Sequence, residues 1–220
     1  PGLYVLETHR AVLEARPDAR VAYGGTVFLP QFIPSGVDFT RRSFERTPGL
    51  AAALRAVAVH AYTLYPPRVS PESDAPMELP HTEKIARMAG MLAQSGVSPD
   101  APLWITEMGW PVTRVVTETL QARWLVRSVL LSGLAGADGV WLYQLGDGPD
   151  AANDLVPEQS FGGMRYDADP TDATPAQPKP SHTALTTLFA TVGALRVVAR
   201  ERPEGAPDDA HVLRLEGAVG

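Results

Sequence analysis

Apolar residues follow two different spacings along the chain, which predict alternating helices and strands. In four segments they recur three and four positions apart, the spacing that places them on one face of a helix. These segments are 3–16, 82–95, 117–135 and 181–192. Between them lie short, nearly continuous apolar runs, which predict strands buried on both faces. The runs are 20–23, 56–59, 103–107 and 140–145.

The order of these elements predicts the fold class. Alternating helices and apolar strands favour parallel pairing with right-handed crossovers. About four strand–helix units are visible, whereas a complete barrel has eight. No GxGxxG pattern follows the first strand, which disfavours a nucleotide-binding doubly wound sheet. We therefore predict an α/β fold, a parallel (β/α) TIM-type barrel of which this chain forms the C-terminal half, about strands 5–8.

Two regions depart from this alternation. Residues 28–38 are rich in Pro, Gly and aromatic residues and predict a loop, followed by a short helical piece at 48–55. Near the C-terminus, two possible strands at 195–200 and 211–215 flank a turn. We therefore expect residues 1–192 to form a partial barrel domain and residues 193–220 to begin a separate C-terminal β element.

Composition and charge narrow the possible partners. The net charge of −6 and the isoelectric point of about 5.4 argue against nucleic acid, because phosphate contacts need clustered Lys and Arg. No apolar run approaches the roughly 20 residues that cross a bilayer. The absence of cysteine excludes disulfides and thiolate metal sites. The first residues already follow a helical pattern, so we expect the N-terminal half of the barrel to be attached in the same polypeptide.

Candidate chemistry lies where the predicted strands end. The run at 103–107 ends in Glu107, and a carboxylate at the C-terminal end of a barrel strand is placed for chemistry. The preceding strand leads into His60 and Tyr62, and the following strand contains Trp141. Because the C-terminal ends of parallel strands meet at one edge, we expect these side chains to lie together.

These segments resemble, in order, the second half of the barrel in the clan A glycoside hydrolases, which include the family 5 cellulases and the family 39 xylosidase-like enzymes. Residues 59–62 look like the sixth strand of that barrel, 104–110 like the seventh and 140–143 like the eighth. The resemblance continues through 161–167 and 179–185 into the last helix, and covers roughly residues 3 to 192. The order of these matches supports the resemblance more strongly than any single motif does.

The resemblance implies a retaining glycoside hydrolase that cleaves β-linked sugars of an oligo- or polysaccharide. Retention needs an attacking carboxylate and a second carboxyl that protonates the leaving oxygen, roughly 5–5.5 Å away. Glu107 is implied as the catalytic nucleophile, and no cofactor is expected. The implied substrate-binding residues are His60, Tyr62, Trp110, Trp141 and Asp147.

The sequence departs from that clan at one position. The acid/base glutamate of the clan follows an asparagine at the end of the fourth strand, but the one asparagine here, Asn153, is followed by Asp154. We therefore expect the acid/base on upstream sequence, and this fragment to be inactive by itself. The reaction type favours an extracellular or periplasmic location.

Two other functions remain open at this point. A metal-dependent hydrolase could use His60, Glu107 and Asp147, which all follow predicted strands, although no His-x-His spacing is present. A non-catalytic carbohydrate-binding barrel would explain the missing acid/base.

The other histidines are not assigned to a site. His9 lies on an apolar stripe and is expected to pack in a helix. His81, His182 and His211 have no partners at ligand spacing and are expected to be solvated.

Overall fold

The structure is a computed structural model of the 220-residue chain. It describes residues 2–27, 36–63, 69–74, 78–166, 177–193, 195–207, 210 and 212–217. Within it the chain forms two compact units. The first comprises Pro1–Met108 and Gly136–Leu142, and the second comprises Gly109–Ala135 and Tyr143–Gly220. No helix of the described residues is both long and apolar enough to cross a membrane.

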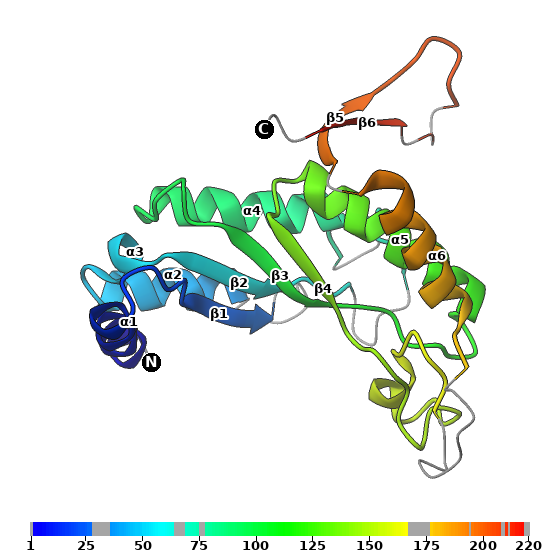
Figure 1. Cartoon of the computed structure of the whole chain (residues 1–220), viewed down its shortest axis with the longest axis horizontal. Coiled ribbons are helices and arrows are strands. Elements are labelled where there is room, and N and C mark those ends of the chain that lie inside the picture. The colour runs from blue at the N-terminus through cyan, green and yellow to red at the C-terminus, as the bar shows by residue number, and fades with distance from the viewer. Residues whose placement is uncertain are drawn as a thin grey trace. The chain divides into compact units, whose positions relative to one another are not determined.

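The first unit contains a parallel four-stranded sheet in the order β1-β2-β3-β4 (Figure 1). The strands are β1 (Ala22–Val27), β2 (Ala56–His60), β3 (Leu103–Met108) and β4 (Gly139–Leu142). Each neighbouring pair is parallel, and His60 at the end of β2 pairs with Glu107 on β3. The predicted parallel α/β fold is therefore confirmed.

The helices of the first unit bury one face each. They are α1 (Gly2–Ala15), α2 (Gly36–Arg46), α3 (Leu50–Ala53) and α4 (His81–Gln94). In α4 the buried apolar side chains recur at helical spacing, as the sequence predicts. They are Ile85, Met88, Met91 and Leu92. The apolar residues of β2, Ala56 to Val59, are all buried, which agrees with a strand covered on both faces.

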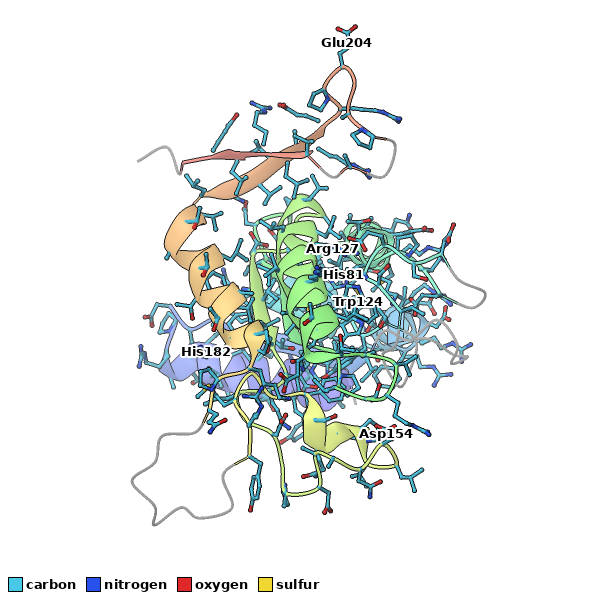
Figure 2. All side chains as sticks on the ribbon, turned by 90° about the vertical axis from the view of Figure 1, so that its right-hand side faces the viewer. His81, Trp124, Arg127, Asp154, His182 and Glu204 are labelled. Atoms are coloured by element: carbon cyan, nitrogen blue, oxygen red, sulfur yellow. The ribbon has the colours of Figure 1, made fainter. Side chains whose placement is uncertain are left out.

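The second unit contains α5 (Glu118–Leu134), a short 3-10 helix (Pro157–Ser160) and α6 (Pro180–Val192). Thr117 caps α5, because its side-chain oxygen accepts a hydrogen bond from the backbone N–H of Leu120. Helices α5 and α6 pack against each other (Figure 1). The last two strands, β5 (Arg196–Glu201) and β6 (Val212–Glu216), form an antiparallel hairpin with Glu204 in its connecting loop (Figure 2). The domain boundary expected at residue 192 stays a prediction.

Two elements differ from the sequence prediction. Helix α2 replaces part of the loop expected at 28–38; its buried residues include the small or polar Gly36, Thr40 and Ser43, so the apolar spacing that marks a helix is weak. Strand β1 continues through Gly24 and Gly25, where we expected it to end. A Cβ at Gly24 would lie 2.1 Å from the carbonyl oxygen of Ala58, so only glycine lets the two strands approach this closely.

The burial of His81 also differs. We expected a solvated side chain, but His81 is fully buried at the start of α4, which begins one residue before the helical segment predicted at 82–95. His9 is buried within α1, as expected. His211 lies outside the described residues.

Candidate active site

The centre of the candidate site is Glu107, the penultimate residue of β3. Its register partner on β2 is His60, while Val59 pairs with Ile105, so that Thr106 is an extra residue on β3. Such a bulge redirects the side chains that follow it and is common beside active sites. The bulge places Glu107 level with the end of β2, where His60 and then Tyr62 leave the sheet.

Two side chains converge on one oxygen of Glu107. The hydroxyl of Tyr62 donates a hydrogen bond to Oε2 at 3.0 Å. Nδ1 of His60 lies 3.2 Å from the same oxygen, and the side chains of Glu107 and His60 are 38% and 18% exposed. Both contacts are to Oε2, so that, as far as the described residues reach, Oε1 is the oxygen available to react. The structure therefore brings together three of the residues that the sequence singled out.

The electrostatics of His60 favour a neutral ring. Burial lowers the pKa of His60 from its ordinary value, and the charge of Glu107 opposes this shift without cancelling it. A neutral imidazole with its proton on Nδ1 would point that proton at Glu107. Hydrogen bonds of this kind favour the ionised form of a carboxylate, which is the form that can attack.

The opposite side of the His60 ring faces β1. Gly25 has a φ of +69°, and a Cβ built on it would lie 3.2 Å from Nε2 of His60. Such a contact is tight enough to displace the ring by a few tenths of an ångström. Glycine at residue 25 therefore provides the space in which His60 reaches Glu107.

Substitution of Gly25 by Ala is expected to lower kcat/KM about three- to tenfold, because misplaced site groups lose reactivity steeply with distance. The measurement is steady-state kinetics on the protein that carries this sequence. Gly49→Ala is the matched control: Gly49 has a φ of +83°, but a Cβ there meets nothing within 4 Å. Both variants carry backbone strain of about 1 kcal/mol. Equal activity of the two variants would show that the position of His60 does not matter.

Trp141 lies on the neighbouring strand but does not point its ring at Glu107. The ring packs edge-on against Trp104, with 5.8 Å between ring centroids, and lies over Gly139. Trp104 is three residues before Glu107, about 10 Å along an extended strand. The side chain is 51% exposed, so one part of the ring remains free. Its role as a sugar platform stays a prediction.

Two expected binding residues, Trp110 and Asp147, belong to the second unit and are buried there. Trp110 is 1% exposed and packs on Trp124 at 5.9 Å, so its ring has almost no surface left for a sugar. Oδ1 of Asp147 accepts hydrogen bonds from Lys179 at 2.7 Å and from the backbone N–H of Gly162 at 2.8 Å. In this geometry both residues hold the second unit together.

The metal-dependent alternative gains no support from this arrangement. It requires the carboxylate of Asp147, which forms a buried ion pair with Lys179. Across the parts of the chain that the structure describes, no group of three or more His, Asp or Glu side chains could hold a metal ion.

Lys84 and Glu78 were not predicted as site residues, yet Lys84 lies next to the backbone of Tyr62. Nζ of Lys84 donates a hydrogen bond to the carbonyl oxygen of Tyr62 at 2.6 Å and forms a buried ion pair with Glu78. The sequence did contain a signal for this lysine. Lys84 lies four residues before Met88, on the buried face of α4, where a lysine is unusual.

Solved structures with a similar fold include family 39 glycoside hydrolases. An enzyme of that family from the gut symbiont Bacteroides cellulosilyticus WH2 matches with a TM-score of 0.68 at 19% identity, over 99% of this chain and 42% of that chain. The GH39 enzyme from Xanthomonas axonopodis pv. citri matches with a TM-score of 0.56 at 18% identity, over 90% of this chain and 37% of that chain. The fold is that of a partial (β/α)8 barrel.

The partial barrel spans about two fifths of the length of these solved structures. No protein-family model matches the chain, and no curated protein sequence matches it. A relation to family 5, and the assignment to the C-terminal half of a barrel, stay predictions.

Proposed function

We propose that this partial barrel belongs to a retaining glycoside hydrolase that cleaves β-linked sugars, with Glu107 as its nucleophile. The observation that carries the proposal is the partly exposed carboxylate at the C-terminal end of β3, with two side chains on Oε2 and no contact to Oε1 from the residues that the structure describes. The likeness to family 39 enzymes supports the same chemistry. The substrate class is an oligo- or polysaccharide.

The proposed reaction has two steps. Oε1 of Glu107 attacks the anomeric carbon while the glycosidic C–O bond breaks, and the leaving oxygen takes a proton from a general acid. Water then attacks the glycosyl ester, giving its proton to the same acid/base group, and Glu107 leaves as a carboxylate. Tyr62 and His60 stabilise the carboxylate before the first step and after the second.

The other assignments are proposals as well. The acid/base carboxyl is proposed to lie outside these 220 residues, because no Asn-Glu pair occurs in them and the chain spans only part of its structural relatives. The exposed part of the Trp141 ring is proposed to contact the sugar. Asp147 and Trp110 are left out of the proposed site, because both are buried. Residues 1–192 would form the barrel part and 193–220 the C-terminal β element.

Covalent trapping tests this function directly. A 2-deoxy-2-fluoro β-glycoside with a reactive leaving group should form a stable glycosyl ester with the protein that carries this sequence. After trypsin digestion, mass spectrometry should locate the added mass on peptide 88–114, in which Glu107 is the single glutamate. An adduct on another peptide would remove Glu107 from its role. Glycoside binding with neither adduct nor turnover would support the non-catalytic alternative.

A further inference from the structure

A buried ion pair lies beside the candidate site. Lys84 is in the first turn of α4, Glu78 precedes that helix, and their side chains are 1% and 0% exposed. Oε2 of Glu78 is buried and accepts no hydrogen bond from the described residues. A buried pair of this kind is often no more stabilising than apolar residues of the same size. Stabilisation of the fold therefore does not explain why the Lys84–Glu78 pair is present.

The pair holds the segment that carries Tyr62. This segment follows the end of β2, so the strand ladder does not hold the backbone of Tyr62 itself. Lys84 donates to the carbonyl oxygen of Tyr62 at 2.6 Å. One turn earlier, His81 hydrogen-bonds to the backbone of Ala61. The N–H of Ala61 in turn donates to the carbonyl oxygen of Glu107 at 3.1 Å.

We propose that Lys84, held by Glu78, is a positioning residue that places the hydroxyl of Tyr62 on the carboxylate of Glu107. The chain of contacts runs from Glu78 to Lys84, to the backbone of Tyr62 and through its side chain to Oε2 of Glu107. This inference rests on the proposed function, since it treats Glu107 as the reacting carboxylate. The groups that face Glu107 are His60 and Tyr62, and Lys84 acts only through Tyr62.

A mutant cycle between the ion pair and Tyr62 tests the proposal. Lys84→Met together with Glu78→Gln removes both charges, and so avoids the uncompensated carboxylate that Lys84→Met alone would bury. Tyr62→Phe removes the hydroxyl itself. Each change is expected to lower kcat/KM roughly ten- to a hundredfold. Each loss is expected in kcat with KM nearly unchanged, because the hydroxyl of Tyr62 contacts the reacting carboxylate.

Non-additivity decides whether Lys84 acts through Tyr62. In the Tyr62→Phe background the charge-removing pair of substitutions should produce little further change in kcat or in kcat/KM. Fully additive effects would overturn the proposal, as would a wild-type kcat in the charge-removed protein. Arg87→Met is the matched control: Arg87 lies one turn from Lys84 on the exposed side of α4, paired with Glu83, and its loss should change neither quantity.

A second readout separates this inference from the proposed function. The carboxyl-carbon NMR chemical shift of Glu107 at one fixed pH, compared between the wild type, Tyr62→Phe, the charge-removed protein and their combination, needs no substrate. A chemical shift that changes equally in the Tyr62→Phe and charge-removed proteins supports the positioning role even if the wild-type protein hydrolyses no glycoside. A chemical shift that changes only with Tyr62→Phe shows that Lys84 does not position that hydroxyl.

Discussion

Replacement of Glu107 by Gln is expected to lower kcat for glycoside hydrolysis by at least about 10⁴-fold, in line with the loss of other catalytic nucleophiles. An amide of the same shape can still accept the hydrogen bond that Tyr62 donates to Oε2, but it cannot form the glycosyl ester. Sugar affinity, measured by calorimetry with an unreactive substrate analogue, should change little. The comparison of kcat with affinity therefore separates loss of chemistry from loss of the fold.

A smaller side chain at residue 107 tests the role of Glu107 through the configuration of the product. Glu107→Ala leaves room for azide, which should restore turnover and give a glycosyl azide of inverted anomeric configuration, because the anion attacks from the face that the nucleophile occupied. Glu83→Gln is the control, since Glu83 is an exposed partner of Arg87 on α4. Unchanged hydrolysis by Glu107→Gln, or an azide product of retained configuration, would contradict the assignment of Glu107.

The free energy of unfolding of the first unit is expected to fall steeply in acid because of His81. Burial lowers the pKa of this side chain to about 3, and the charge of Lys84 acts in the same direction, while the Ala61 backbone and Glu72 oppose the shift. Between an unfolded pKa of about 6.5 and the folded value, the unfolded chain binds the proton and the folded chain does not. The contribution of His81 to the free energy of unfolding is therefore fully present above about pH 6.5. It is lost as the pH falls, by up to on the order of 5 kcal/mol.

Urea unfolding from about pH 8 down to about pH 4 measures this effect. His81→Gln removes the titrating group and can still donate to Ala61, so its stability should vary less with pH. His182→Gln on α6 is the control, because His182 is exposed (Figure 2). The pKa of His9 is also lowered by burial, so a smaller acid dependence should remain in the His81 variant. An identical dependence in wild type and His81→Gln would show that His81 is not buried in its neutral form.

Much of the fold could be predicted because its signals are local. The spacing of apolar residues in α4 and the uninterrupted run of β2 identify a helix and a buried strand without reference to the rest of the chain. The meeting of His60 and Tyr62 with Glu107 was also predictable, because the C-terminal ends of parallel strands lie at one edge. Helix α2 was missed, since its buried face includes small and polar side chains.

Other properties depend on what packs against a residue, and local patterns carry little information about that. Trp110 and Asp147 follow their strands in the expected order, yet one ring is enclosed beside Trp124 and one carboxylate is neutralised by Lys179. His81 has no local feature that distinguishes a buried imidazole from a solvated one.

The order of residues was therefore sufficient to establish alternating helices and parallel strands, and to place a carboxylate at the end of β3. Only the folded chain decided that both contacts fall on Oε2 of that carboxylate, that Gly25 makes room for His60, and that Lys84 holds Tyr62. The physical reason is that backbone pairing and helix formation follow local spacing, whereas desolvation and hydrogen bonding depend on neighbours that are distant in the sequence.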